Sequence, residues 1–224
     1  DYGVIPIENS TEGVINHTLD MFVDSDLKIC AEILLKVSHN LLSKSKSLKE
    51  IKKIYTGLQP LAQSRDWIET NLSKANIFEV STTSEAAKMA SLEKGSAAIA
   101  SELAAEIYGL NILTKNIEDI VNNYTRFLVI GKKYVAKTGN DKTSIVFSIK
   151  DKVGALYTML IPFKKNGINL TSIESRPSKK KVWDYYFFID LLGHVEDKKV
   201  SKALKELSKE CLFLKILGSY PTAV

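Results

Sequence analysis

The protein has 224 residues, of which 45% are hydrophobic and 25% charged, with a formal net charge of +5. This length suits two domains, and no apolar run approaches the roughly 18 residues of a membrane-spanning helix. Cys30 and Cys211 lack CxxC spacing and are expected to be reduced thiols of a cytoplasmic protein. The surplus lysines lack interleaved aromatic residues, so we expect a solvated surface rather than nucleic-acid or membrane binding; they are Lys44, Lys46, Lys49, Lys52, Lys53 and Lys179–Lys181.

The first polar cluster follows a strand predicted over residues 2–7. Asn9 suits a helix N-cap, and Glu12 stands three residues later, as in a capping box, so a helix is predicted to run on through Phe22. The free N–H groups of its first turn would hold a carboxylate or phosphate, although simple helix capping is the alternative. Because the chain opens within a strand, we expect an N-terminal portion of this domain to precede it.

A second strand-to-helix turn is predicted at residues 81–87, where Thr82 and Glu85 again have capping-box spacing and Ser81 adds a hydroxyl. His39, after a strand, is expected to be a structural hydrogen-bonding residue rather than a base. The remaining pattern predicts strands over 27–37, 51–56, 77–80, 97–100 and 111–114, helices over 59–72 and 101–108, and a loop over 44–50.

The third cluster is Asn122–Phe127, which leads into the short apolar run Leu128–Gly131. This pattern indicates a loop that leads into a buried strand, with the Thr125 hydroxyl and the Arg126 guanidinium at the start of the strand. A solvated turn is the alternative. Alternating strands and helices over residues 1–131 predict an α/β domain with a mostly parallel sheet. If the three clusters face one cleft, they suit a small organic anion with two separated negative groups. The sequence has no GxGxxG, P-loop or metal-spaced His/Cys set, which leaves cofactor-free and metal-free chemistry or plain binding.

The pattern changes after a polar segment, residues 132–142, which is predicted to be a linker. Residues 143–224 then follow the order strand, helix, strand, strand, helix, strand, which is a ferredoxin-like βαββαβ domain. The predicted elements span 143–149, 154–165, 169–174, 183–191, 198–209 and 212–217. The edges of such a sheet favour pairing with a second copy.

At this point the residues resemble a known family, the prephenate dehydratases with a C-terminal ACT regulatory domain. The resemblance covers essentially the whole chain. It rests on motifs in a specific order and separation: Pro6–Ser10, Ser81-Thr82 with Ala86-Ala87, Asn123–Phe127, Glu174–Pro177 and Leu217–Pro221. It implies a two-lobed catalytic domain like the periplasmic binding proteins at 1–131 and an ACT domain at 143–224. Some relatives carry a chorismate mutase domain further upstream.

The resemblance also implies a reaction, the decarboxylating dehydration of prephenate to phenylpyruvate in phenylalanine synthesis. Aromatisation drives this reaction, so the enzyme needs chiefly to bind, orient and help the hydroxyl leave. Thr125 is the expected hydrogen-bond donor to that hydroxyl, and Glu8 either supplies the proton or is structural. Arg126 either anchors a carboxylate or braces its loop. The other expected substrate-binding residues are Asn9, Ser10, Ser81, Thr82 and Phe127.

For the ACT domain, the resemblance implies feedback regulation by phenylalanine, bound between two ACT domains of a homodimer or of a homotetramer built from dimers. One partner would supply the turn Gly154, Ala155 and Leu156, and the other Glu174, Ser175, Arg176 and Pro177, with Asn169 nearby. Two departures from the family pattern are Val153, where relatives often have proline, and Gly57–Pro60. An arogenate dehydratase and a non-catalytic sensor of small anions or amino acids are the alternatives.

Overall fold

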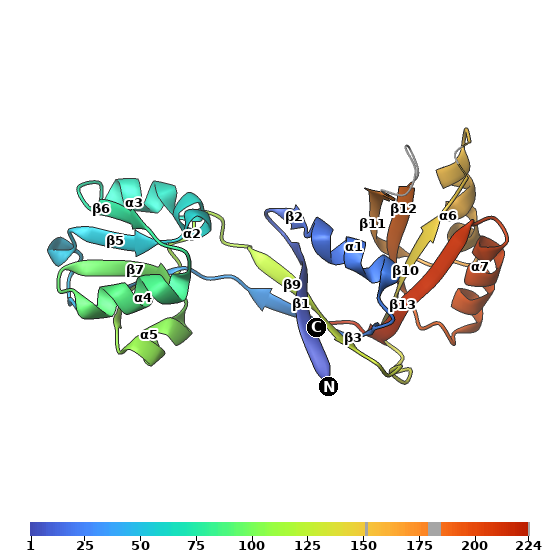
Figure 1. Ribbon diagram of the computed structural model, residues 1–224, viewed down its shortest axis with the longest axis horizontal. Helices are drawn as coiled ribbons and strands as arrows, with labels where there is room; N and C mark the ends of the chain where they lie inside the picture. The colour runs from blue at the N-terminus through green and yellow to red at the C-terminus, as the bar shows by residue number, and fades with distance from the viewer. Residues whose placement is uncertain (151, 179–184, 224) are drawn as a thin grey trace. The chain divides into compact units, whose positions relative to one another are not determined.

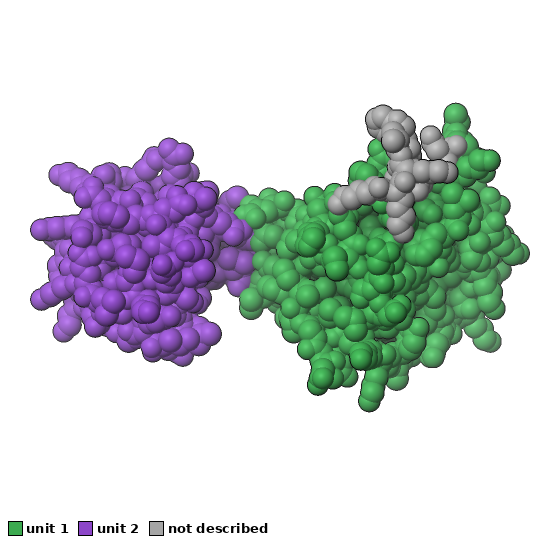
Figure 2. Space-filling model, viewed as in Figure 1, with its two compact units in different colours: residues 1–35, 124–224 green, residues 36–123 purple. Residues whose placement is uncertain are grey.

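The computed structural model describes residues 1–150, 152–178 and 185–223. The chain forms two compact units, and the first is assembled from two separate segments, residues 1–35 and 124–224, while the second comprises residues 36–123 (Figure 2). The boundary between the units therefore differs from the predicted boundary between the two domains, because the ACT region packs into one unit with parts of the preceding region.

The first sheet of unit 1 has the strand order β2-β1-β9-β3. Its strands are β1 (Tyr2–Asn9), β2 (Gly13–Val14), β3 (Lys28–Lys36) and β9 (Tyr124–Gly131), with helix α1 (Asn16–Asp24) between β2 and β3. The predicted helix start at Asn9 is wrong. The Asn9 side-chain oxygen instead accepts hydrogen bonds from the N–H groups of Thr11 and Glu12, at 2.9 and 3.1 Å, and turns the chain from β1 into β2.

The second sheet of unit 1 has the order β11-β12-β10-β13, with antiparallel pairing throughout. Its elements are β10 (Asp141–Ser148), α6 (Ala155–Lys165), β11 (Leu170–Pro177), β12 (Tyr185–Leu192), α7 (Lys198–Ser208) and β13 (Phe213–Pro221). This is the predicted βαββαβ plan. No helix or strand lies between β9 and β10, as expected for the predicted linker.

Both faces of this second sheet are covered. Ile145, Phe147 and Ile189 pack against α6 and α7, which lie together on one face (Figure 1). Val146, Phe188 and Leu217 point the other way and share a core with side chains from β1, α1, β3 and β9: Ile7, Leu19, Phe22, Ile29 and Leu128. Because β10 and β12 have packed side chains on both faces, their apolar stretches Ile145–Phe147 and Phe187–Ile189 have no polar alternation.

Unit 2 holds a sheet with the order β6-β5-β7-β4-β8. Its elements are β4 (Asn40–Ser43), the single turn η1 (Leu48–Glu50), β5 (Lys53–Thr56), α2 (Leu58–Gln63), α3 (Arg65–Asn71), β6 (Asn76–Glu79), α4 (Thr83–Leu92), β7 (Ser96–Ala100), α5 (Glu102–Tyr108) and β8 (Asn111–Thr114). Buried alanines let α4 and α5 pack closely on the sheet.

The structure corrects three expectations for residues 1–131. The sheets are not mostly parallel: β5 pairs in parallel with β6 and β7, but β4 runs antiparallel to β7 and β8, and β1 antiparallel to β9. Strand β4 was not predicted, since only four residues follow His39 before the polar loop. The helix predicted over 59–72 is two helices separated at Ser64. Within the described residues, no helix is long and apolar enough to cross a membrane.

Candidate functional site

Thr125 lies at the start of β9, directly opposite Asn9 of β1. The Asn9 side-chain N–H donates a 3.0 Å hydrogen bond to the Thr125 hydroxyl oxygen. The two backbone N–H groups held by the other end of the amide fix which atom of Asn9 is oxygen and which is nitrogen. Since Thr125 accepts from Asn9, its own hydroxyl hydrogen is not used in this bond and is available to donate.

Ser10 forms two hydrogen bonds with Tyr124, the residue that precedes Thr125. Its N–H donates to the carbonyl of Tyr124 at 2.9 Å, and its hydroxyl accepts from the Tyr124 N–H at 2.9 Å. Phe127 lies two residues further along β9, opposite Pro6, and is half-buried. The structure thus brings Asn9 and Ser10 of the first polar cluster beside Thr125 of the third.

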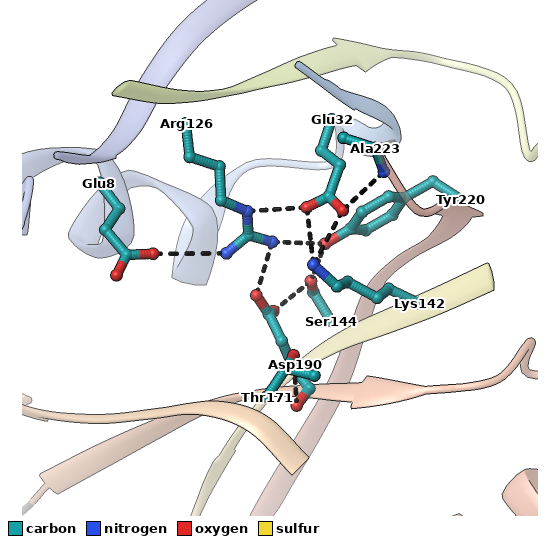
Figure 3. Close-up of polar contacts among 9 residues, drawn as sticks. All are labelled: Glu8, Glu32, Arg126, Lys142, Ser144, Thr171, Asp190, Tyr220 and Ala223. Carbon is teal, nitrogen blue, oxygen red and sulfur yellow. Dashed lines mark hydrogen bonds and ion pairs between the residues drawn. The ribbon is translucent and has the colours of Figure 1, made fainter. Parts of the chain in front are cut away.

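Arg126 points to the opposite face of β9 from Thr125, because successive side chains of a strand alternate. Its guanidinium lies among three carboxylates: Nε is 2.8 Å from Glu32, Nη2 is 2.7 Å from Asp190 of β12, and Nη1 is 3.7 Å from Glu8 (Figure 3). Nη2 also donates to the Tyr220 hydroxyl at 3.1 Å. This placement favours the bracing role expected for Arg126 over the carboxylate-anchoring one, and it puts Glu8 on the opposite face from Thr125.

Other hydrogen bonds complete the group, which we call the Arg126 cluster: Glu8, Glu32, Arg126, Lys142, Ser144, Asp190 and Tyr220. Lys142 donates to both oxygens of Glu32, at 2.8 and 3.1 Å, and the Ala223 N–H adds a third donor at 2.9 Å. Ser144 donates to Asp190, so its own oxygen accepts from Tyr220 at 2.7 Å. Arg126 and Lys142 balance the inner carboxylates Glu32 and Asp190, and Glu8 lies at the exposed edge.

The electrostatics of the cluster shift the pKa values of Glu32, Arg126 and Tyr220. Burial opposes ionisation of Glu32, but the hydrogen bonds from Lys142 and Ala223 and the charge of Arg126 outweigh it and lower the pKa of this carboxyl. Burial likewise disfavours the charged guanidinium, yet Asp190, Tyr220 and Glu32 raise the pKa of Arg126 overall. Burial and the charge of Asp190 raise the pKa of the Tyr220 phenol, which therefore stays neutral and donates.

Ser81 and Thr82 belong to unit 2, where they begin α4. The Thr82 hydroxyl accepts from the Glu85 N–H at 3.1 Å, and the Glu85 carboxylate accepts from the Ser81 N–H and hydroxyl at 3.1 and 2.9 Å. The predicted capping box is present, with Glu85 reaching one residue beyond the N-cap. These hydroxyls are already engaged in starting the helix, and a role for them with substrate stays a prediction.

A buried polar group in unit 2 includes His39 and Asn123. His39 Nε2 lies 2.8 Å from the Gln63 side-chain oxygen, which also accepts from Asn123 at 3.3 Å. The His39 N–H donates to the buried carboxylate of Glu118 at 2.9 Å. His39 is therefore a structural hydrogen-bonding residue, as predicted. Asn123, which precedes the Tyr-Thr-Arg-Phe run, fixes the last residue of unit 2 through its hydrogen bond to Gln63.

The predicted effector residues fall into two groups. Gly154, Ala155 and Leu156 line an open pocket of about 450 Å³ together with Tyr185 and Phe187 of β12. Gly154 takes a left-handed conformation (φ 77°) at the start of α6. The second group lies on β11, where Arg176 makes a two-pronged ion pair with Asp20 of α1, both contacts at 3.1 Å. Glu174 lines a separate, small cavity of about 30 Å³, beside Arg126 and Asp190.

The remaining predicted effector residues flank these groups. Asn169 precedes β11, and its carbonyl accepts from the Leu192 N–H at 3.0 Å, while Ser175 and Pro177 pair across the sheet with Phe187 and Tyr185. Among the residues described, no group of three or more His, Cys, Asp or Glu side chains is arranged to hold a metal ion.

Comparison with known proteins places this geometry in a family. The prephenate dehydratase family model matches residues 1–135, which is more than half of the chain. The chain belongs to the prephenate dehydratase family. The ACT domain model matches residues 143–209. These matches confirm the resemblance to the prephenate dehydratases and the α/β class with a C-terminal ACT domain, whereas the predicted boundaries at 131 and 143 stay predictions.

Individual relatives extend this finding. The chain is 54% identical, over all of its length, to the bifunctional chorismate mutase/prephenate dehydratase of Aquifex aeolicus, of which it covers 62%. It is 43% identical to the prephenate dehydratase of Methanocaldococcus jannaschii, covering 98% of this chain and 80% of that protein. A crystal structure of prephenate dehydratase in complex with L-Phe from Arthrobacter aurescens is 35% identical, with a TM-score of 0.85 over 99% of this chain and 75% of that one. The chain thus spans about three fifths of the bifunctional relative.

Sequence reasoning missed most of the Arg126 cluster in this prephenate dehydratase family member. A usable signal was present in two strands. Glu32 and Asp190 are lone acids inside strongly apolar runs, Ile-Cys-Ala-Glu-Ile-Leu and Phe-Phe-Ile-Asp-Leu-Leu. A buried acid must be paired, so each predicts a cationic partner. The sequence does not say which one, because Arg126 and Lys142 lie 94 and 110 residues away from Glu32.

Proposed function

We propose that this protein is a prephenate dehydratase, which converts prephenate to phenylpyruvate. The carboxylate on the ring leaves as carbon dioxide, its bonding electrons form a ring double bond, and the ring hydroxyl leaves with a proton as water. The Asn9–Thr125 pair carries the proposal. Asn9 donates to Thr125 and so directs the threonine hydrogen away from itself, where it can donate to the departing hydroxyl.

The chemistry requires little beyond this donor. Ring aromatisation supplies the driving force, so binding and orientation account for much of the remaining rate. Ser10 fixes the backbone beside Thr125. We assign a substrate-binding role to Asn9, Ser10 and Phe127 of unit 1, and to Ser81 and Thr82 of unit 2. Glu8 is the weaker candidate for the proton source, since it points to the Arg126 face.

The test is steady-state kinetics of Thr125→Ala and Thr125→Ser in the complete polypeptide in which these residues occur. We expect alanine to lower kcat by about 10²–10⁴-fold with little change in KM, and serine to retain most activity, because it keeps the hydroxyl. Thr70→Ala, on an exposed face of α3, is the matched control. Full activity of a folded Thr125→Ala protein would remove Thr125 from the mechanism. Arogenate as a second substrate distinguishes an arogenate dehydratase, and no turnover of either substrate would indicate a sensor.

The regulatory half of the proposal is that phenylalanine binds the ACT domain between two copies of the chain. The pocket of about 450 Å³ has two aromatic side chains, Tyr185 and Phe187, that suit a benzyl group. Glu174 and Arg176 are not among the residues that line this pocket. Their participation therefore requires a second chain, as in a homodimer, with a homotetramer as the larger form. We include a cytoplasmic location in the proposal, supported by the two free thiols, Cys30 and Cys211.

Calorimetric titration with phenylalanine tests this half. Arg176→Ala alone is ambiguous, because it also breaks the ion pair between Arg176 and Asp20. Asp20→Asn is the matched control, since it weakens the same ion pair and leaves Arg176 in place. If Arg176 contacts the effector, binding disappears in Arg176→Ala and persists in Asp20→Asn. Equal loss in both variants would mean that the ion pair matters and Arg176 does not touch phenylalanine. Sedimentation of the same samples gives the oligomeric state.

A further inference from the structure

The Arg126 cluster crosses from the strand that carries Thr125 into the ACT sheet. Arg126 on β9 contacts Asp190 on β12 at 2.7 Å and Tyr220 on β13 at 3.1 Å. Lys142 of β10 reaches back to Glu32 of β3. The side chains of Arg126, Glu32, Lys142 and Asp190 are at most 15% exposed. These pairs are shielded from solvent and are therefore far less screened than surface pairs.

Strand β12 connects this cluster to the ACT pocket. Tyr185 and Phe187 line the pocket beside Gly154 and Leu156. Phe188 and Asp190 project from the other face of the same strand and border the cavity next to Arg126. Alternation along one strand explains this division. A ligand that displaces Tyr185 or Phe187 acts on the backbone of β12, which carries Asp190 five residues after Tyr185 and three residues after Phe187.

At the β9 end of this connection, Arg126 is the residue that directly follows Thr125 in the chain. The position of Thr125 depends on the β1–β9 ladder and on its bond to Asn9. The guanidinium of Arg126 holds β9 from the face opposite to Thr125, so a change in its partners shifts the strand rather than contacting the substrate. Arg126 and Asp190 are therefore positioning residues.

We propose that the Arg126–Asp190 ion pair is the coupling element through which occupancy of the ACT pocket sets the position of Thr125. This inference rests on the proposed function and names the route of its regulation. The two states differ in the contacts of Asp190: the pair is intact in this structure, and a bound effector that moves β12 weakens or re-aims it. Coupling of this kind typically changes a rate or affinity 5- to 150-fold.

The experiment uses the complete polypeptide and three variants. Asp190→Asn removes the charge that faces Arg126 and keeps the size of the side chain. Ser144→Ala is milder, because it removes the hydroxyl that orients Asp190 and leaves every charge in place. Glu206→Gln is the matched control: it breaks the 3.6 Å ion pair to Lys165 between α6 and α7, within the ACT domain and away from β9. Should Asp190→Asn not fold, Ser144→Ala carries the test.

Three quantities are measured for each protein: the phenylalanine Kd by calorimetry, the ratio of rates without and with saturating phenylalanine, and hydrogen exchange of the 124–131 amides with and without phenylalanine. In the unaltered protein and in Glu206→Gln we expect a rate ratio of at least fivefold and a phenylalanine-dependent change in exchange. In Asp190→Asn we expect the ratio to fall below about twofold and the exchange response to vanish, with Kd changed less than about threefold. Ser144→Ala should lie between.

Two results would overturn the inference. One is Asp190→Asn, or Ser144→Ala in its place, retaining the full rate ratio and exchange response. The other is phenylalanine binding to the unaltered protein without any change at 124–131. Failure of the proposed function looks different, because a protein that turns over neither prephenate nor arogenate still reports the coupling through hydrogen exchange.

Discussion

Replacing Glu32 by glutamine should destabilise unit 1 by about 3 kcal/mol at pH 7. The Glu32 side chain is 1% exposed and accepts four hydrogen bonds, one from Arg126, two from Lys142 and one from the Ala223 N–H. Glutamine keeps one acceptor oxygen and presents an N–H₂ group to donors, so about two of these bonds are lost. Hydrogen bonds to charged groups contribute about 1.5–3 kcal/mol each, and breaking a buried ion pair costs about 3–5 kcal/mol. Because Lys142 can be partly rehydrated in the variant, we expect a loss of unfolding free energy at the lower end of these ranges.

The pH dependence gives a second measure of the same carboxyl. Because the folded-state pKa of Glu32 is lowered, its ionised form stabilises the fold at pH values above its unfolded pKa, about 4.3. This stabilisation is lost as the pH falls through the lowered folded-state value. The difference in unfolding free energy between the unaltered protein and Glu32→Gln should therefore narrow as the pH falls from 7 toward 3.

The assay is urea unfolding read by pulsed hydrogen exchange and mass spectrometry. Peptides from 124–131 report unit 1, and peptides from 53–56 and 96–100 report unit 2 as an internal reference. Glu69→Gln is the control, because its pair with Arg65 is 64–74% exposed and should contribute less than about 0.5 kcal/mol. A loss below about 1 kcal/mol in unit 1, or a difference that stays constant with pH, would refute this account of the cluster.

Two further predictions concern backbone approach and thiol chemistry. Gly218→Ala should destabilise unit 1 by about 3 kcal/mol or more in the urea assay, because the added Cβ would lie 2.2 Å from the Ile29 carbonyl oxygen. Gly57→Ala is the control: its added Cβ would have its nearest contact at 3.6 Å, so this variant should lose less than about 1 kcal/mol of stability. Equal effects would contradict the close approach. Burial, with a smaller effect of Glu210, raises the pKa of Cys211 to about 11, so iodoacetamide at pH 8 should modify it about 100-fold more slowly in the folded protein than in urea. Equal rates would contradict the raised pKa of this thiol.

Much of the fold could be predicted from the sequence because local signals agree with the final packing. The apolar strands β3, β7 and β12, the capping residue Thr82 and the stop at Gly109, whose φ is +61°, all follow from residue chemistry within a few positions. Asn9 is the instructive failure. Asparagine caps a helix and an Asx turn by the same bond, from its side-chain oxygen to N–H groups two and three residues ahead. Only the pairing of Glu8 with Val14 distinguishes the two, and a local pattern does not contain it.

Sheet direction failed for a related reason. Alternating strands and helices do predict parallel neighbours where a helix connects them, and β5, β6 and β7 are indeed parallel. The chain, however, enters unit 2 through β4, which runs antiparallel to β7, and leaves it through β8, which runs antiparallel to β4. Likewise β9 returns beside β1 after more than a hundred residues. Pairings over such distances depend on tertiary contacts that periodicity does not report.

The candidate site divides along a single strand, and this division could not be predicted from the motif. Thr125 and Arg126 are adjacent in sequence, which suggests one shared purpose. Pleating sends them to opposite faces, Thr125 toward Asn9 and Arg126 toward the ACT sheet. One short motif therefore supplies both a candidate proton donor and the buried cation that ties its strand to Asp190. The compact unit that joins residues 1–35 and 124–224 is held by the same contacts and by a shared core that includes Ile7, Leu128 and Phe188, which line a cavity together with Arg126. In this fold the ACT sheet packs directly against the strand that carries Thr125, which is the contact that the proposed regulation requires.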